Sequence, residues 1–288
     1  MKVKYDCFAC LSRQTVTLAE KVTDDSAIQR KIIERGIRTL SETAFQNSTP
    51  KITADIFDLS TELSGEVDPY KYEKMRFNDI AEELIKKYKL KDIINKSDDP
   101  LETAIRLSIA GNIIDFSAKD NVDETDVVEA IETSLKTNVF GMDMNLFKEL
   151  TQNATKIMLI GDNSGEIVFD KLLAEFFDSE KLTYVVKGGP IVNDATEEDA
   201  EYVQINKLAR IITTGSAIQG ADFEYCSQEF IDELNDSDVI ICKGQANFET
   251  LDDYTNKPMF YLLQAKCIPV AKEIGCQKGD FVMMSNIR

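Results

Sequence analysis

Polar residues that could bind a cation follow two apolar segments in the second half of the chain. Asp162 and Asn163 come just after the apolar run that ends at Ile160, and Asp194 follows the next such run. Two carboxylates and an amide carbonyl are hard oxygen ligands, which suit Mg²⁺ or Mn²⁺ better than Zn²⁺. In neighbouring parallel strands these side chains would lie within reach of one ion. The alternative is a strand-to-helix turn whose Asp or Asn only caps the helix.

The turn that begins at Asp162 continues through Ser164, Gly165 and Glu166 into an amphipathic helix. Free backbone N–H groups at a helix start suit an anion, so we predict that these three residues contact the substrate. The charge of Glu166 favours the helix start but would repel a phosphate placed there. This side chain could instead orient water or a ligand.

A lysine follows the most apolar run of the chain, Val239 to Cys242. Lys243 precedes a glycine, and its ammonium could point into the crevice that holds the metal. It would then supply positive charge to an anionic substrate, and Gln245 in the same segment is predicted to contact that substrate. The alternative is a lysine simply solvated at a turn. Lys187, at the corresponding place after another run, is a second candidate.

Asn112 and Asp115 lie three residues apart in an apolar segment, which places them on one face of a predicted helix. A buried Asn or Asp must be hydrogen-bonded or coordinated. A polar clamp between helices and a substrate-facing role are both open. We predict substrate contact, because the helical first half has little else to close over the crevice.

Cys7 and Cys10 form one CxxC pair near the start of the chain. A zinc site would need a second pair at this spacing, which the other four cysteines do not offer. Structural thiols on a first helix are therefore favoured over metal or redox chemistry. The first residues do not form a signal peptide, so we expect reduced thiols and a cytoplasmic protein.

The 288-residue chain contains no histidine and is strongly acidic. Its 33 Lys and Arg against 51 Asp and Glu give a net charge of −18. The lack of histidine excludes Ser-His and Cys-His nucleophile pairs and imidazole metal sites. The charge has the wrong sign for a nucleic-acid partner, and no apolar run is long enough for a membrane span. A small anionic ligand would need local positive charge from a metal or from lysines.

These residues would be positioned by a helical first half and an α/β second half. Apolar spacing predicts helices over residues 11–22, 28–45, 68–88, 100–118 and 123–141, and no strand before about residue 155. Continuous apolar runs predict buried parallel strands over 156–160, 183–186, 208–213, 238–242, 258–263 and 281–284. We divide the chain into a helical N-terminal domain, residues 1–150, and an α/β metal- and substrate-binding domain, residues 151–288. Four glycine-bearing polar loops should meet at one edge of the sheet.

The chain resembles the metal-dependent damage-control phosphatases, a family long known as a domain of unknown function, and is most similar to its compact stand-alone microbial branch. At two positions the sequence departs from many relatives, with Ser164 in place of alanine and Ala246 in place of glycine. The alanine restricts the backbone after Gln245. The resemblance rests on the order and spacing of motifs along nearly the whole chain: the CxxC pair, Pro69-Tyr70 with Lys74 and Asn78, Gly111-Asn112 to Asp115, Gly161-Asp162-Asn163, Val192-Asn193-Asp194, Lys243-Gly244-Gln245, and Ala265-Lys266-Cys267 to Val270-Ala271.

The resemblance implies a helical N-terminal lobe packed on a three-layer α/β/α Rossmann-like sandwich with a mostly parallel sheet. It also implies Mn²⁺ or Mg²⁺ at Asp162, Asn163 and Asp194, with Co²⁺ or Ni²⁺ as substitutes in vitro. The substrates would be phosphate monoesters of small metabolites, such as sugar phosphates, phosphorylated cofactor precursors or damaged forms of these. Phosphoryl transfer needs mostly positioning and charge neutralisation, so the missing histidine is no obstacle.

The residues predicted to be catalytic are Asp162, Asp194 and Lys243. Attack by water and attack by a carboxylate both stay open, as do the substrate and the oligomeric state. A transferase that binds S-adenosylmethionine or a nucleotide is an alternative on a Rossmann-like fold, although residues 161–165 lack the G-x-G-x-x-G spacing. A non-catalytic metal-binding module is another alternative, in which the same oxygens would hold a cation for structure only.

Overall fold

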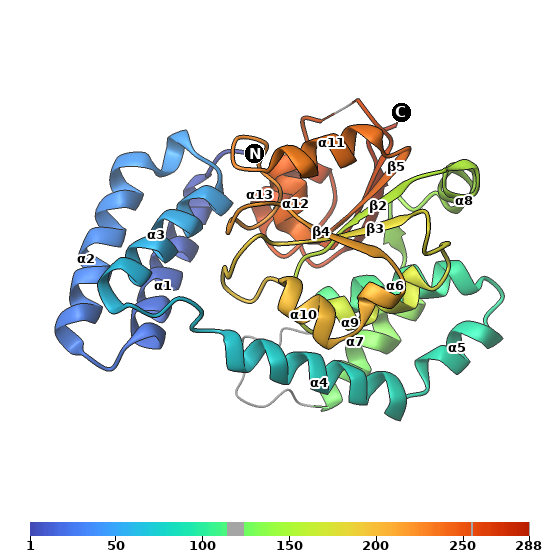
Figure 1. The fold of residues 1–288 in the computed structure, drawn as a ribbon, viewed down its shortest axis with the longest axis horizontal. Helices are drawn as coiled ribbons and strands as arrows, with labels where there is room; N and C mark the ends of the chain where they lie inside the picture. The colour runs from blue at the N-terminus through green and yellow to red at the C-terminus, as the bar shows by residue number, and fades with distance from the viewer. Residues whose placement is uncertain (114–123, 255, 288) are drawn as a thin grey trace.

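A seven-stranded sheet forms the centre of the computed structural model, which describes residues 1–113, 124–254 and 256–287, and helices cover both faces of this sheet (Figure 1). The strand order is β1-β7-β6-β5-β2-β3-β4, and each neighbouring pair is parallel except β6 with β7. The strands are β1 Val139–Phe140, β2 Ile157–Ile160, β3 Leu182–Val186, β4 Arg210–Thr213, β5 Val239–Lys243, β6 Met259–Gln264 and β7 Phe281–Ser285. The predicted α/β class with a mostly parallel sheet is confirmed.

Side chains of the central strands alternate between two apolar layers. In β2, Ile157 and Leu159 pack in the core on one face of the sheet, whereas Met158 and Ile160 pack in the core on the other. The first core also contains residues of α4 to α10, and the second contains residues of α11 to α13. Burial of both faces explains why these strands are continuous apolar runs.

The helices are α1 Tyr5–Val22, α2 Ser26–Thr43, α3 Thr49–Ser64, α4 Lys71–Lys87, α5 Leu90–Lys96, α6 Pro100–Ile113, α7 Glu124–Lys136, α8 Met144–Asn153, α9 Glu166–Ala174, α10 Glu197–Tyr202, α11 Gln228–Asp236, α12 Gly244–Leu251 and α13 Ile268–Ile274. Several differ from the prediction: α3, α5 and α8 were not predicted, and α4 begins at Lys71 rather than at residue 68. Within the described ranges, no helix is both long and apolar enough to cross a bilayer.

The prediction that no strand precedes residue 155 was wrong. Val139 and Phe140 form β1, which pairs with Phe281 and Val282 of β7 at the edge of the sheet. The helix predicted to end near residue 141 ends at Lys136 instead. A strand of two residues is too short to show a periodicity, and its pairing partner lies in the last strand of the chain.

Helices α1 to α3 form a bundle with a core of its own, which stands beside the sheet in Figure 1. This core includes Leu11, Ile32 and Ile52, and it is joined by Ile191 and Ile218 from the α/β part. The helices from α4 onward instead pack in the two cores on the faces of the sheet. The proposed domain boundary at residue 150 stays a prediction, and the apolar packing changes earlier, after α3.

Asp238 joins the starts of β2 and β5. Its Oδ2 atom accepts hydrogen bonds from the backbone N–H and the hydroxyl of Thr155, at 2.7 and 2.8 Å, and from the backbone N–H of Lys156 at 3.1 Å. The bond from the Thr155 hydroxyl, followed by the two backbone bonds, lowers the pKa of Asp238. We expect Asp238→Ala to lower the free energy of unfolding by about 1 kcal/mol, as typical for lost hydrogen bonds.

The loss of stability expected in Asp238→Ala should depend on pH. Because folding lowers the pKa of Asp238, its stabilisation is present above the unfolded-state value of about 3.9 and is lost as the pH falls through the folded-state value. Urea unfolding of the wild type and the variant at pH 7 and pH 3 checks this, with exposed Asp24→Ala as the control. An equal difference in stability at both pH values would contradict this account.

Candidate active site

A cavity of about 490 Å³ lies between the α1 to α3 bundle and the loops that follow the strands. Of the residues predicted to form the site, Asn112, Asp162, Asn163 and Gln245 line this cavity. Its opposite wall comes from the bundle, through Cys7, Cys10 and Gln14 of α1 and Thr49, Pro50 and Thr53 of α3. The volume is within the usual range for small-molecule sites.

The loops after β2 and β3 are held together by their backbones. Asn163 and Asp194 form an antiparallel bridge, and the backbone N–H of Ala195 donates to the carbonyl oxygen of Asp162 at 2.9 Å. Asp162 and Asp194 interact electrostatically, because the charge of Asp194 contributes to the raised pKa of Asp162. The structure thus brings together the three residues that the sequence pattern placed around one cation.

Negative charge is concentrated around Asp162 and Asp194. Burial, together with the charges of Glu166 and Asp194, raises the pKa of Asp162 to about 8. The pKa of Asp194 is also raised, mainly by burial, although Lys187 and a hydrogen bond from Gln219 oppose this. Lys187 lies 3.7 Å from Asp194 Oδ2, and Gln219 donates to Asp194 Oδ1 at 3.0 Å. Carboxylates forced together in this way favour a bound cation.

The available oxygen atoms fit a hard divalent cation. Asp194 Oδ2 is buried and accepts no hydrogen bond in the described part of the chain. Asn163 uses its amide nitrogen to donate to Asp162 and Glu166, at 2.8 and 3.2 Å, which leaves its carbonyl oxygen available. Among the described residues, no three cysteine, aspartate or glutamate side chains gather in a way that could hold a metal. A cation here would therefore need the carbonyl of Asn163 beside the two aspartates.

Asn112 links helix α6 to the predicted metal loop. Its amide nitrogen donates to Asp162 Oδ2 at 3.0 Å and to Glu166 Oε2 at 2.7 Å, and its carbonyl oxygen is buried without a hydrogen-bond partner among the described residues. Glu166 is fully buried and does not line the cavity. Its contacts with Asn112 and Asn163 agree with the orienting role, not with direct contact to an anion. Asp115, the other polar residue predicted on this helix, lies outside the described residues.

Lys243 does not point into the cavity, contrary to the expectation. It is fully buried, and its ammonium contacts Glu166 Oε1 at 2.6 Å, Asp170 Oδ1 at 2.5 Å and the carbonyl oxygen of Ser108 at 3.1 Å. Burial alone would lower the pKa of Lys243, but the charges of Asp170 and Glu166 raise it. All three ammonium donors bind groups of the protein. Lys243 therefore holds Glu166 and Asp170 in place and has no donor left for a substrate.

The backbone amides at the start of α9 are also already engaged. The N–H of Ser164 donates to the carbonyl oxygen of Asn193 at 2.9 Å, and the N–H of Gly165 donates to Asn78 Oδ1 at 2.6 Å. The Ser164 hydroxyl is buried and donates to Asp199 at 3.0 Å. These two amides are therefore not free to bind a phosphate, because each already donates a hydrogen bond within the protein.

The segment after β5 is a helix rather than a loop, since α12 begins at Gly244 directly after the strand. Gln245 lines the cavity from the first turn of this helix and donates to Glu249 Oε1 at 2.8 Å. Sequence reasoning assigned no role to Lys266, which follows β6 and lines the same cavity together with Lys278. The charge of Lys266 lowers the pKa of Asp162. Ligands bind at the carboxyl ends of parallel strands, and this rule, applied to β6 as well, would have identified Lys266.

The CxxC cysteines lie at the rim of the cavity. Cys7 and Cys10 line it from α1, and Cys267 lines it from the start of α13. The pKa of Cys267 is raised, mainly by burial, and its thiol lies 3.7 Å from Gln245 Oε1. The described residues include no metal-binding group of three such side chains.

Gly244 allows α12 to approach Asp162 closely. Its φ is +77°, and a Cβ atom there would lie 1.8 Å from Asp162 Oδ2. We expect Gly244→Ala to displace the Asp162 carboxylate and to lower turnover at this site at least about tenfold, in addition to about 1–2 kcal/mol of backbone strain. Gly275→Ala is the matched control, because φ is +87° there but no atom lies within 4 Å of the added Cβ. Equal turnover in the two variants would contradict the expectation.

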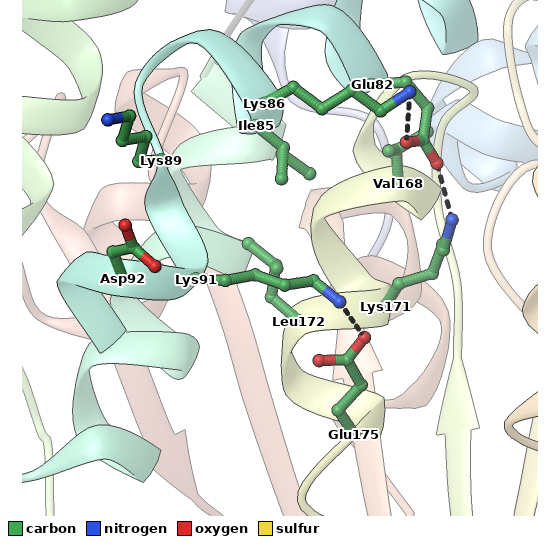
Figure 2. A pocket seen from close by; sticks show the side chains of 10 residues that line it. All are labelled: Glu82, Ile85, Lys86, Lys89, Lys91, Asp92, Val168, Lys171, Leu172 and Glu175. Atoms are coloured by element: carbon green, nitrogen blue, oxygen red, sulfur yellow. Dashed lines mark hydrogen bonds and ion pairs between the residues drawn. The ribbon is translucent and has the colours of Figure 1, made fainter. Parts of the chain in front are cut away.

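A second hollow, of about 400 Å³, lies between α4, α5 and α9 (Figure 2). Its rim is formed by lysine and glutamate pairs across these helices: Lys171 with Glu82 at 2.5 Å, Lys86 with Glu82 at 3.7 Å, and Lys91 with Glu175 at 2.5 Å. Glu82 and Glu175 pair with these lysines, and none of the predicted site residues lines the hollow. The 490 Å³ cavity is therefore the candidate site.

Comparisons with known proteins agree with this architecture. A model of the damage-control phosphatase ARMT1-like domain matches residues 3–282. A damage-control phosphatase of Pyrococcus horikoshii is 36% identical over 99% of both chains, and one of Archaeoglobus fulgidus is 34% identical over 98% of both. An uncharacterized protein of Methanocaldococcus jannaschii is 36% identical over 99% of this chain and 95% of its own. The crystal structure of a DUF89 family protein from P. horikoshii superposes with a TM-score of 0.88, at 35% identity over 99% of each chain.

Proposed function

This chain belongs to the damage-control phosphatase ARMT1-like family, and on that premise we propose that it is a divalent-metal-dependent phosphatase that acts on phosphate monoesters of small metabolites. Mn²⁺ or Mg²⁺ would be held by Asp162, Asn163 and Asp194. The observation that carries the proposal is the group of buried carboxylates beside the cavity, among them an Asp194 oxygen that accepts no hydrogen bond from the described residues and lies 3.7 Å from the Lys187 ammonium. A hard cation would satisfy these oxygens.

Residues of the cavity wall and of the metal loop would have different roles in this reaction. Lys266 and Lys278 line the cavity and attract the phosphate into an otherwise acidic protein. Asn112 and Asn163 donate to Asp162 and Glu166 and so fix the direction of their carboxylates. Helices α1 and α3 form the opposite wall of the cavity and limit the access of water. When bound, a divalent cation supplies charge neutralisation at the phosphoryl oxygens and lowers the pKa of water.

The proposal is tested with protein stripped of metal by a chelator. Release of inorganic phosphate would be measured with p-nitrophenyl phosphate and a panel of phosphorylated metabolites, each with Mn²⁺, Mg²⁺, Co²⁺ or Ni²⁺. We expect turnover that requires an added metal and is abolished by chelator. Absence of hydrolysis with every metal, combined with tight binding of S-adenosylmethionine, would overturn the proposal in favour of a transferase.

A further inference from the structure

The two carboxylate oxygens of Asp194 have different surroundings. Oδ1 accepts a hydrogen bond from the side-chain amide of Gln219 at 3.0 Å. Oδ2 accepts no hydrogen bond from the described residues and lies 3.7 Å from the ammonium of Lys187. Since the amide occupies Oδ1 and restricts the rotation of the carboxylate, Oδ2 is the oxygen that Asp194 has left for a cation.

Gln219 belongs to a third loop, which follows β4 and contributes none of the three predicted metal ligands. Its side chain lines the 490 Å³ cavity. The next residue, Gly220, accepts a hydrogen bond at its carbonyl oxygen from the Lys187 ammonium at 2.8 Å. The same loop therefore supplies the amide that contacts Oδ1 of Asp194 and holds the ammonium that lies near Oδ2.

This short segment is fixed on both sides of Gln219. Ile218, which precedes it, is only 8% exposed and belongs to the core of the α1 to α3 bundle. The backbone N–H of Ala221, which follows two residues later, donates to the hydroxyl of Thr250 on α12 at 2.9 Å. The amide of Gln219 thus lies between two anchored neighbours, which set its direction toward Asp194.

The turn that carries Asp194 is itself held by the bundle. The backbone N–H of Asp194 donates to the carbonyl oxygen of Ile191 at 3.1 Å, and Val192 within this turn has a φ of +45°. A β-branched residue is strained at such an angle, and the strain persists only where surrounding contacts hold the segment. Ile191 belongs to the bundle core, and Val192 packs against it. The bundle therefore fixes the backbone at Asp194, and Gln219 fixes its side chain.

We propose that Gln219 is a positioning residue, which orients Asp194 so that Oδ2 binds the divalent cation. A carboxylate that is already held by a hydrogen bond loses little rotational freedom when a metal binds, so its affinity for the metal is higher. The inference rests on the proposed function and adds to it a residue outside the three proposed metal ligands. The alternative is an amide that contacts the substrate directly from the cavity wall.

The test is the binding of Mn²⁺ alone, measured by isothermal titration calorimetry on protein stripped of metal by a chelator. Gln219→Met keeps the length of the side chain but removes the donor, and we expect it to raise the dissociation constant for Mn²⁺ about 10- to 100-fold. Gln228→Met is the matched control, because Gln228 also donates to an aspartate, Asp232 Oδ1 at 2.8 Å, but at an exposed position of α11. The control should bind Mn²⁺ as tightly as the wild type.

A second variant and a second readout separate positioning from other roles. Gln219→Asn keeps the amide but withdraws it from Asp194 by one C–C bond, about 1.5 Å, so it should also raise the dissociation constant about tenfold or more. A merely structural hydrogen bond would lower the melting temperature in both variants without a change in Mn²⁺ affinity. At saturating Mn²⁺, KM for p-nitrophenyl phosphate should stay within about twofold of the wild-type value, because a positioning residue does not touch the substrate.

Wild-type affinity for Mn²⁺ in a folded Gln219 variant would overturn the inference. A raised KM at saturating Mn²⁺ with an unchanged dissociation constant would also overturn it, and would place Gln219 against the substrate instead. In both cases the wild type still binds Mn²⁺, so the proposed function stands. If the wild type itself binds no Mn²⁺, the proposed function fails together with the role of Gln219.

Discussion

Asp162→Asn is expected to lower the metal-dependent turnover of a phosphate monoester about 1000-fold. The substitution keeps the shape of the side chain but removes one of the two negative charges proposed to hold the cation. Loss of the metal removes several kcal/mol of transition-state stabilisation, and each 1.4 kcal/mol corresponds to a factor of ten in rate. Turnover of p-nitrophenyl phosphate with Mn²⁺ would be compared with that of the exposed control Asp24→Asn.

Stability measurements on the same variant separate catalysis from a structural role. The metal-free variant should be as stable as the wild type or more stable, because Asp162 is buried beside the charges of Glu166 and Asp194. Addition of Mn²⁺ should raise the melting temperature of the wild type but not that of the variant. A non-catalytic metal-binding module would show the same loss of Mn²⁺ stabilisation with no turnover in the wild type, and wild-type turnover in Asp162→Asn would contradict the metal assignment.

Lys243→Met is expected to lower the free energy of unfolding by about 3–5 kcal/mol, since removal of one partner of a buried ion pair leaves an uncompensated charge. Here two carboxylates, Glu166 and Asp170, would lose their counter-charge in a fully buried position. Urea unfolding measures the effect. The exposed pair of Lys91 and Glu175 provides the control, because Lys91→Met should cost less than about 1 kcal/mol.

A second substitution tests the cause of that loss. In Lys243→Met with Asp170→Asn, one of the unpaired charges is removed, so at least about 1 kcal/mol of stability should return. The hydroxyls of Ser108 and Tyr184 both donate to Asp170, and an amide at this position keeps one oxygen acceptor for them. If Lys243→Met instead unfolds like the wild type but has a raised KM for phosphate esters, Lys243 binds the substrate directly, as the sequence alone suggested.

The sheet could be predicted because its central strands are buried on both faces and therefore appear as uninterrupted apolar runs. Each of the six predicted strands is present, with ends that differ by at most two residues. The loops that carry Asp162, Asn163 and Asp194 could be predicted for the same reason, since parallel strands end at one edge. Edge strand β1 could not be predicted, because its pairing partner lies at the far end of the chain.

The direction of Lys243 was mispredicted although the information was available. Side chains alternate along a strand, and Ile241 of β5 belongs to the core that contains α6 and α9. Lys243, two residues later, faces the same side and so lies beneath those helices. The wall formed by α3 could not be derived from the strand pattern, because Thr49 reaches the site through packing of the bundle against the sheet domain.

The burial of α6 has a consequence for synthesis of the protein. Its residues Ala104, Ile105, Leu107, Ile109 and Ala110 are completely inaccessible, and the helix packs against α9 and β6. Both partners are translated later, and β6 emerges from the ribosome on the order of ten seconds after α6 at ordinary elongation rates. Until then β6 cannot cover its side of α6, so part of the apolar surface of this helix stays exposed on the nascent chain.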